Sequence, residues 1–169
     1  MHRAHTLILL VVLALSVTIP LSADPSATSV GLGFSFGAAF PTGSTVSIPS
    51  TDGQPSFNWG FYVNIPLAST FHITPSSELY KFNTQNATDV DCAFKLIVPL
   101  GSFDVYAGVS PGLTTVADVL APHVGILGGA AFRLISNLDA FVQGKYSVLF
   151  EGGRTMGIFH LNAGILFAF

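Results

Sequence analysis

His160-Leu-Asn-Ala-Gly-Ile-Leu-Phe-Ala-Phe169, the end of the sequence, is the stretch that decides the fold. Its large apolar residues alternate with small or polar ones. The apolar set is Phe159, Leu161, Ala163, Ile165, Phe167 and Phe169; the other set is His160, Asn162, Gly164, Leu166 and Ala168. A period of two predicts a β-strand with one apolar face. A terminal Phe gains little in water but is favourable at a membrane boundary, so we expect this face to meet lipid.

Seven upstream segments show the same alternation, and together they predict eight strands. The expected strands are 30–40, 57–67, 71–80, 89–100, 103–110, 124–134, 138–150 and the terminal 159–169. Tight turns near Ser69, Gly101 and Asn137 alternate with longer polar or irregular segments, which we expect to be loops at 41–56, 81–88, 113–122 and 151–155. Short turns on one side and long loops on the other are typical of membrane barrels. In the third strand, Pro75 predicts a bulge or a register shift.

Composition supports the same fold class. Half of the residues are hydrophobic and 9% are charged, against about a quarter charged in ordinary globular domains. Residues 1–23 have a basic start, a short apolar run and small residues before Asp24, so we expect a cleaved signal peptide followed by one domain at 24–169. No later apolar run approaches the roughly 20 residues of a membrane helix. The sequence therefore predicts an all-β, antiparallel, up-and-down eight-stranded transmembrane β-barrel.

Charged residues lie on the face opposite the aromatic one. Those in the expected strands are Asp89, Asp91, Lys95, Asp104, Arg133, Asp139 and Lys145, and His160 shares their face. A charge facing lipid at mid-membrane costs about 2–4 kcal/mol, so this face should line the lumen. We expect a polar network near the tight-turn end, with Lys95 beside Asp104 and Arg133 beside Asp139. Such a network either fills the lumen as a plug or lines a selective path.

The terminal motif Asn162-x-Gly164-x-x-Phe167-x-Phe169 resembles the C-terminal assembly signal of bacterial outer-membrane β-barrels. With strand number, turn pattern and strand length, residues 29–169 resemble the small barrels grouped as OmpA-transmembrane-like, OmpX-like and OmpW-like. This resemblance implies insertion into the bacterial outer membrane by the barrel-assembly machinery, and contact with outer-membrane lipid.

The sequence indicates no catalytic or cofactor-binding site. His72-Ile-Thr74 and His160-Leu-Asn162 resemble the His and Ser pair of outer-membrane lipid A deacylases. Thr or Asn replaces Ser, however, and both pairs are expected to point inward, so we predict no enzymatic activity. No His, Cys and acidic group has metal-ligand spacing. With five Lys and Arg against nine Asp and Glu after the signal peptide, a nucleic-acid partner is not expected.

Two functions remain open. In the first, a barrel with a largely filled lumen acts through its four loops in adhesion, surface exposure or envelope integrity, with a host or envelope ligand at those loops. In the second, the protein is an OmpW-like channel for small hydrophobic molecules. The second draws on the apolar segment 116–120 and on inward apolar residues, namely Tyr62, Ile97, Tyr106, Leu127, Phe141 and Leu149.

Overall fold

The computed structural model describes residues 29–42, 54–82, 85–116 and 119–169. The expected signal peptide, residues 1–23, and most of the expected loop 41–56 lie outside them. Eight strands are present: β1 (Gly31–Thr42), β2 (Ser56–Ala68), β3 (Phe71–Phe82), β4 (Gln85–Pro99), β5 (Phe103–Val116), β6 (Val119–Ile135), β7 (Leu138–Glu151) and β8 (Arg154–Ala168). In the described ranges we find no helix with the length and hydropathy needed to cross a bilayer.

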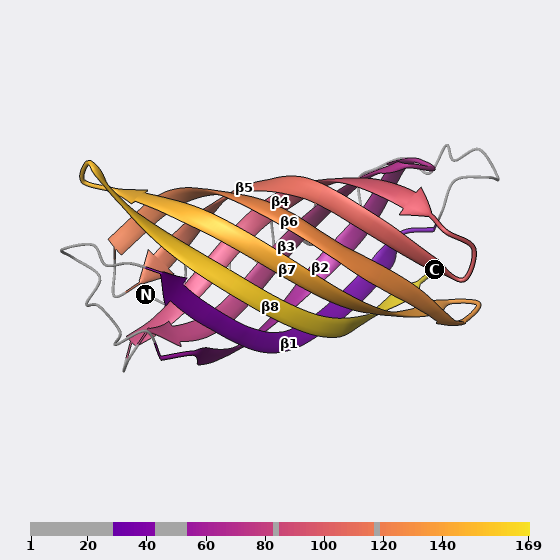
Figure 1. Cartoon of the computed structure of the whole chain (residues 1–169), viewed down its shortest axis with the longest axis horizontal. Coiled ribbons are helices and arrows are strands. Elements are labelled where there is room, and N and C mark those ends of the chain that lie inside the picture. Colours follow the sequence, from indigo (N-terminus) through magenta and orange to yellow (C-terminus); the bar gives the residue numbers. More distant parts are fainter. Residues whose placement is uncertain (1–28, 43–53, 83–84, 117–118) are drawn as a thin grey trace.

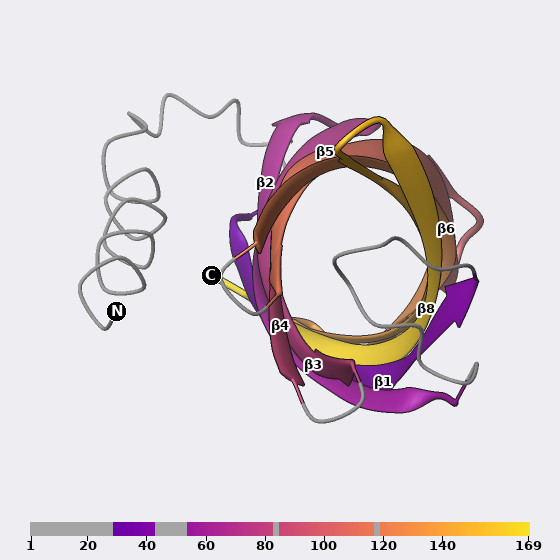
Figure 2. The same ribbon diagram turned by 90° about the vertical axis from the view of Figure 1, so that its left-hand side faces the viewer.

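The strands form one closed antiparallel barrel in sequence order (Figure 1). β1 pairs with β8 over its whole length, from Gly31 opposite Ala168 to Thr42 opposite Gly157. Viewed from the end, the strands make a continuous ring (Figure 2). Closure removes the free edges that would otherwise leave backbone groups unpaired in a membrane. The predicted eight-stranded, up-and-down fold class is confirmed.

The outer face of the barrel is almost entirely apolar. Large side chains that are at least one-third exposed include Phe36, Phe61, Leu96, Ile126, Val142, Leu161 and Phe167. Aromatic rings gather on β1 and β2, where the Phe34 and Phe61 ring centroids are 5.4 Å apart. Among charged residues of the described strands, Lys81 alone shares the face of these apolar side chains, and it lies near the end of β3. Such a surface suits lipid and not water.

The register shift expected at Pro75 is absent, but the pairing of β3 with β2 is interrupted there: Tyr62 lies opposite Ser76, and the next pair is Ile65 opposite Ile73, in the same register. β3 pairs with β4 without interruption from Phe71 opposite Leu96 to Phe82 opposite Gln85. The register shift lies instead on β2, between Pro66 and Ala68, next to the β2–β3 turn. Pro75 itself is partly exposed on the outer face, and a proline is tolerated where its missing N–H breaks no essential ladder bond.

Three of the expected loops are largely strand. β3 ends at Phe82 and β4 begins at Gln85, so most of 81–88 is paired. In the same way β5 and β6 extend through 113–116 and 119–122. The segment 151–155 contains a two-residue turn, Gly152–Gly153, between Glu151 and Arg154. Both glycines have positive φ, 53° and 79°, which matches the twist of a tight hairpin turn. The expected loop 41–56 also loses its ends, since Thr42 and Ser56 lie in strands.

We predict that a charge on the outer face destabilises the barrel according to its depth. Val142, 49% exposed near the middle of β7, is replaced by Arg. The free energy of unfolding in lipid vesicles should fall by about 2–4 kcal/mol. The control Thr155→Arg, next to the β7–β8 turn, should cost about 0–1 kcal/mol. Equal losses for the two variants would contradict a lipid-facing outer surface.

We also predict that deleting Phe169 impairs assembly. The Phe169 backbone N–H donates to Val30 O at 2.9 Å, and its ring packs edge-on against Phe167 with centroids 5.0 Å apart. The deletion should lower the amount of heat-shifting, folded protein in outer-membrane fractions, while Phe150→Ala, at an exposed aromatic residue of β7, serves as the control. Normal outer-membrane levels of the truncated chain would contradict the role of the terminal motif.

Candidate functional site in the barrel interior

The interior of the barrel divides into three layers along its axis. A polar layer, which we call the Lys145 cluster, lies across the middle. It comprises Lys145 with Asn58, Glu78, Asp89, Asp91, Thr114, His123, His160 and Asn162. An apolar layer lies between this cluster and the β7–β8 turn, and a cavity lies on the opposite side, toward the β6–β7 turn. Each layer is built from inward positions of several strands.

The Lys145 ammonium lies among three carboxylates. Its Nζ is 2.8 Å from Asp91 Oδ2, 3.0 Å from Asp89 Oδ2 and 3.2 Å from Glu78 Oε2. Lys145 is 2% exposed, so the ion pairs are shielded from water. An ammonium has three N–H donors, and here Lys145 donates hydrogen bonds to Asp89 and Asp91 and forms an ion pair with Glu78. Because Lys145 is on β7 and the acids are on β3 and β4, the contacts cross the lumen.

Asp89 is held from a second side. Its Oδ1 accepts a hydrogen bond from Thr114 Oγ1 at 2.9 Å and lies 3.2 Å from His123 Nδ1. Asp91 accepts a short hydrogen bond from Ser76 Oγ. These contacts use the carboxylate oxygens that Lys145 does not, which orients both acids toward the ammonium. A buried carboxylate with all of its oxygens engaged is far less costly than an unpaired one.

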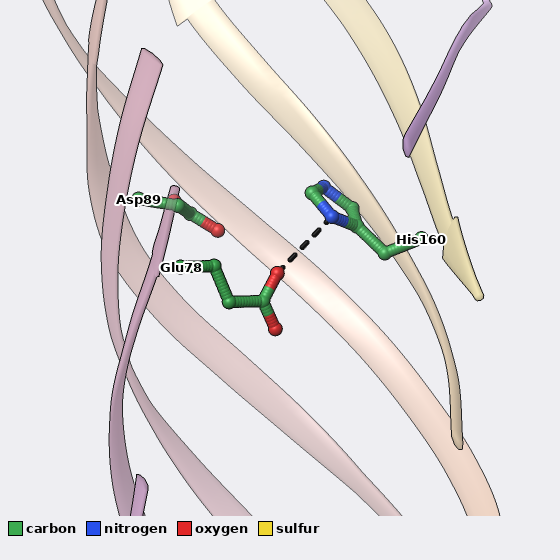
Figure 3. Close-up of side chains that lie close together, drawn as sticks. All are labelled: Glu78, Asp89 and His160. Atoms are coloured by element: carbon green, nitrogen blue, oxygen red, sulfur yellow. Dashed lines mark ion pairs between the residues drawn. The ribbon is translucent and has the colours of Figure 1, made fainter. Parts of the chain in front are cut away.

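Glu78 connects the cluster to β8. Its Oε2 is 3.1 Å from His160 Nδ1, and Figure 3 shows the two side chains pointing at each other across the lumen, beside Asp89. Asn162 Nδ2 donates to Glu78 Oε1 at 3.1 Å, and Asn58 Nδ2 donates to Asn162 Oδ1 at 2.7 Å. The polar residues therefore form one continuous network around the ring of strands.

The cluster contains two sets of potential metal ligands: Glu78, Asp89 and His160, and Asp89, Asp91 and His123, each with ligand atoms within 4.8 Å of one another. The same three carboxylates already contact Lys145 Nζ, however. The ammonium lies between them where a cation would bind, so a metal would have to displace it. We therefore assign these residues to an internal ion-pair network.

The structure separates the predicted lumen residues into two groups. Asp89, Asp91, Lys145 and His160 come together in the middle of the barrel. The other group lies toward the end with the β2–β3, β4–β5 and β6–β7 turns, which we call the tight-turn end; it comprises Lys95, Asp104, Arg133 and Asp139. The expectation that the network would lie at that end is therefore wrong for the first group.

At the tight-turn end, one expected ion pair forms and the other does not. Arg133 Nε is 3.7 Å from Asp139 Oδ1, at the barrel mouth, with 64% of the Arg133 side chain exposed. Lys95 makes no ion pair with Asp104. On the ladder Lys95 is opposite Gly108, whereas Asp104 is opposite Pro99, so the two differ by four positions. At about 3.3 Å per residue this separates their backbones by about 13 Å.

Sequence reasoning missed Glu78, Asn58, His123 and Thr114. Glu78 and Asn58 have the inward alternation of their own strands, and this parity could have identified them. Parity could not identify Thr114 and His123, because the sequence predicts a loop at 113–122 and a strand that begins only at residue 124. β5 ends six residues later than expected, at Val116, and β6 begins five residues earlier, at Val119.

The apolar layer was also unexpected. Its residues are Ala39, Tyr80, Ala87, Val116, Ala121, Leu149, Met156 and Ile158, all at most 4% exposed. Val116, Ala121 and Met156 belong to the strand extensions that replace the predicted loops. Burial of these side chains inside the barrel excludes water on that side of the Lys145 cluster.

The residues of the terminal motif occupy distinct environments. Asn162 is buried in the Lys145 cluster, whereas Phe167 and Phe169 are exposed on the outer face. Gly164 has no room for a side chain, because a Cβ there would lie 2.2 Å from Phe34 O and 2.5 Å from the Phe141 ring. The glycine and the asparagine are thus explained by packing alone, and the assembly role of the motif stays a prediction.

The fold is shared with solved outer-membrane barrels, although neither the known protein families nor the curated protein sequences give a match to this chain. Neisserial surface protein A is similar with a TM-score of 0.70 and 13% identity, covering 85% of this chain and 99% of that one. Ail, the attachment invasion locus protein of Yersinia pestis, is similar with a TM-score of 0.52 and 10% identity, covering 83% of this chain and 99% of that one. The outer membrane enzyme PagL is similar with a TM-score of 0.52 and 11% identity, covering 82% of this chain and 99% of that one. At these identities the likeness establishes the small outer-membrane barrel fold.

We predict that Lys145→Met destabilises the barrel by about 3–5 kcal/mol, because it leaves buried carboxylates without a counter-charge. The measurement is urea unfolding of protein refolded in vesicles. Adding Glu78→Gln, Asp89→Asn and Asp91→Asn to the same variant should recover most of the loss, since the uncompensated charges disappear. No recovery in the fourfold variant would show that Lys145 acts through packing and not through charge.

Proposed function

We propose that the protein is an integral outer-membrane barrel whose lumen is closed by its own side chains. It acts through its surface at the end that contains the β7–β8 turn. The membrane assignment is supported by the apolar, aromatic outer face and by the shared fold. The strands are 12 to 17 residues long, whereas about 9–11 residues cross a bilayer. The barrel is therefore long enough to extend beyond the hydrocarbon core.

The observation that carries the closed lumen is the position of Lys145. Its side chain reaches across the lumen to acids on β3 and β4, at 2.8 to 3.2 Å. Between this cluster and the β7–β8 turn, the apolar layer includes Leu149 and Ile158, both 0% exposed. A solute would have to break buried ion pairs and displace packed apolar side chains to pass. This supports the plug interpretation over a selective path.

The acting surface differs from the loops that the sequence suggested. Only two residues separate β3 from β4 and β5 from β6, and the turn Gly152–Gly153 joins β7 to β8, so the described part of this end is a rim of paired strands. Its outward residues are mixed: Lys81 is on β3, and Thr115 lies opposite the exposed Leu120 in the β5–β6 ladder. We propose that this rim, together with the segment 43–53, contacts host or envelope partners, in adhesion, surface exposure or envelope integrity.

We further propose that the terminal strand directs assembly through the barrel-assembly machinery. β8 closes the barrel against β1, so its correct pairing completes the fold. Its outward aromatic residues and the tightly packed Gly164 fit a strand that must be recognised and then joined. We also propose no enzymatic role, since the two histidine pairs that resemble the deacylase pair lie inside the barrel, where His72 hydrogen-bonds with Asn64 and His160 contacts Glu78.

The alternative, an OmpW-like channel for small hydrophobic molecules, has less support. Five of its six inward apolar residues, all except Leu149, line the cavity on the tight-turn side. Leu149 lies in the apolar layer on the other side of the Lys145 cluster. The apolar surface is therefore interrupted by charge instead of forming a continuous funnel. A channel would need both layers to open together.

We predict that the refolded barrel shows no discrete conductance in a planar bilayer. The buried ion pairs and the apolar layer should keep the ionic current at the level of the protein-free membrane. Insertion is checked on the same preparation by the heat-dependent shift in gel mobility of the folded barrel. Reproducible openings of the wild-type protein would contradict the closed lumen and favour the channel.

A further inference from the structure

The barrel contains a cavity between the Lys145 cluster and the tight-turn end, which we call the cup. Its volume is about 170 Å³. Glu78, Asp91 and Lys145 form its floor, and Ser136 and Asn137 of the β6–β7 turn lie at its mouth. The cup is therefore blind, with its floor at the closed middle of the barrel. Its volume is close to that of a cavity of about 150 Å³ that holds benzene.

Lys95 presents a buried ammonium to the cup without a partner. The residue is 9% exposed and lines the cavity. Within the part of the chain that the structure describes, no carboxylate lies within 4.0 Å of its Nζ and no hydrogen bond joins it to an acceptor. Buried charges are normally paired, and Lys145, on the floor of the cup, is paired three times. Lys95 is the buried cation that the protein itself does not satisfy.

Two tyrosine rings hold the Lys95 ammonium in place. Nζ is 4.9 Å from the Tyr106 ring centroid and 5.8 Å from that of Tyr62, within the range of cation–π attraction. Each ring lies over a glycine of the neighbouring strand: a Cβ on Gly33 would be 1.9 Å from Tyr62, and one on Gly129 would be 2.5 Å from Tyr106. The rings are thus fixed against the barrel wall and keep the ammonium directed into the cup.

The other charges of the cup leave Lys95 uncompensated at close range. Arg133 pairs with Asp139 at the mouth, and the acids of the floor contact Lys145 instead of Lys95. Asp104 remains, and it lies four ladder positions from Lys95, nearer the mouth. Apolar side chains make up much of the remaining wall. Ile97, Leu127 and Phe141 line it, and Phe141 packs edge-on against Tyr62 with centroids 5.1 Å apart.

A buried cation without a paired carboxylate, in a pocket of this size with apolar side chains on part of its wall, suits an anionic ligand with an apolar body. We propose that the cup binds a small organic carboxylate that enters from the tight-turn side. Its carboxylate accepts charge-assisted hydrogen bonds from Lys95 Nζ, and its apolar body packs against Leu127 and Phe141. Binding requires no passage through the barrel, so it is independent of whether the rim has the role proposed above.

The test uses benzoate as the probe, with the refolded barrel in zwitterionic detergent and calorimetry as the readout. Benzoate should bind saturably, and neutral benzyl alcohol of the same size at least about tenfold more weakly, because it lacks the charge. Lys95→Met should weaken benzoate binding by about tenfold or more, whereas the exposed Lys81→Met leaves it unchanged. Asp104→Asn removes a negative charge that repels the benzoate carboxylate, so this variant should bind benzoate more tightly than the wild type.

Three outcomes would overturn the proposal. One is the absence of saturable benzoate binding up to millimolar concentrations. The second is equal binding to the wild type and to a correctly folded Lys95→Met variant. The third is displacement of benzoate by inorganic phosphate at equal concentration, which would reduce the cup to an unselective anion site. If Lys95→Met does not refold, the benzyl alcohol and Asp104→Asn comparisons decide the matter on folded protein.

Discussion

The Lys145 ammonium and its three carboxylates are the interaction on which the interior of this barrel depends. Lys145 is on β7, and Glu78, Asp89 and Asp91 are on β3 and β4, so the contacts join opposite parts of the ring. Each charge would be costly in the interior without its partner. Because the acids are further held by Thr114, Ser76 and Asn162, the ammonium has one geometry available. The same contacts close the lumen and separate its two remaining layers.

This arrangement follows from the surroundings of the barrel. A lipid-facing surface excludes charge, so nearly every charged strand residue must point inward. An eight-stranded barrel has space inside for side chains but little for water. The inward charges must therefore satisfy one another, and in the middle of the barrel they do so around a single lysine. Lys95 is the exception, since tyrosine rings and not carboxylates surround it.

Much of the fold could be predicted from the sequence, because a period of two assigns each residue to one face. The strand count, the closed topology and the lumen face of Lys145 and Asp89 all follow from parity. Strand ends did not follow, since Pro111, Gly112 and Pro122 look like loop residues yet lie in the β5–β6 ladder. The position of each residue along the barrel axis could not be predicted from the sequence either. Arg133 and Asp139 are directly opposite on the ladder and do pair, whereas Lys95 and Asp104 are offset and do not. The contacts of Lys145 join residues 54 and 56 positions apart, and no local pattern predicts them.

The most direct test of the closed, ion-paired lumen is the ¹⁵N NMR signal of the Lys145 ammonium in the refolded barrel. Hydrogen bonds to two buried carboxylates and an ion pair with a third predict a distinct ammonium resonance whose protons exchange slowly with water, with couplings across the hydrogen bonds to the side-chain carboxyl carbons of Asp89 and Asp91. The exposed Lys81 should give a rapidly exchanging signal in the same sample. A Lys145 ammonium that exchanges as fast as that of Lys81 would contradict the account.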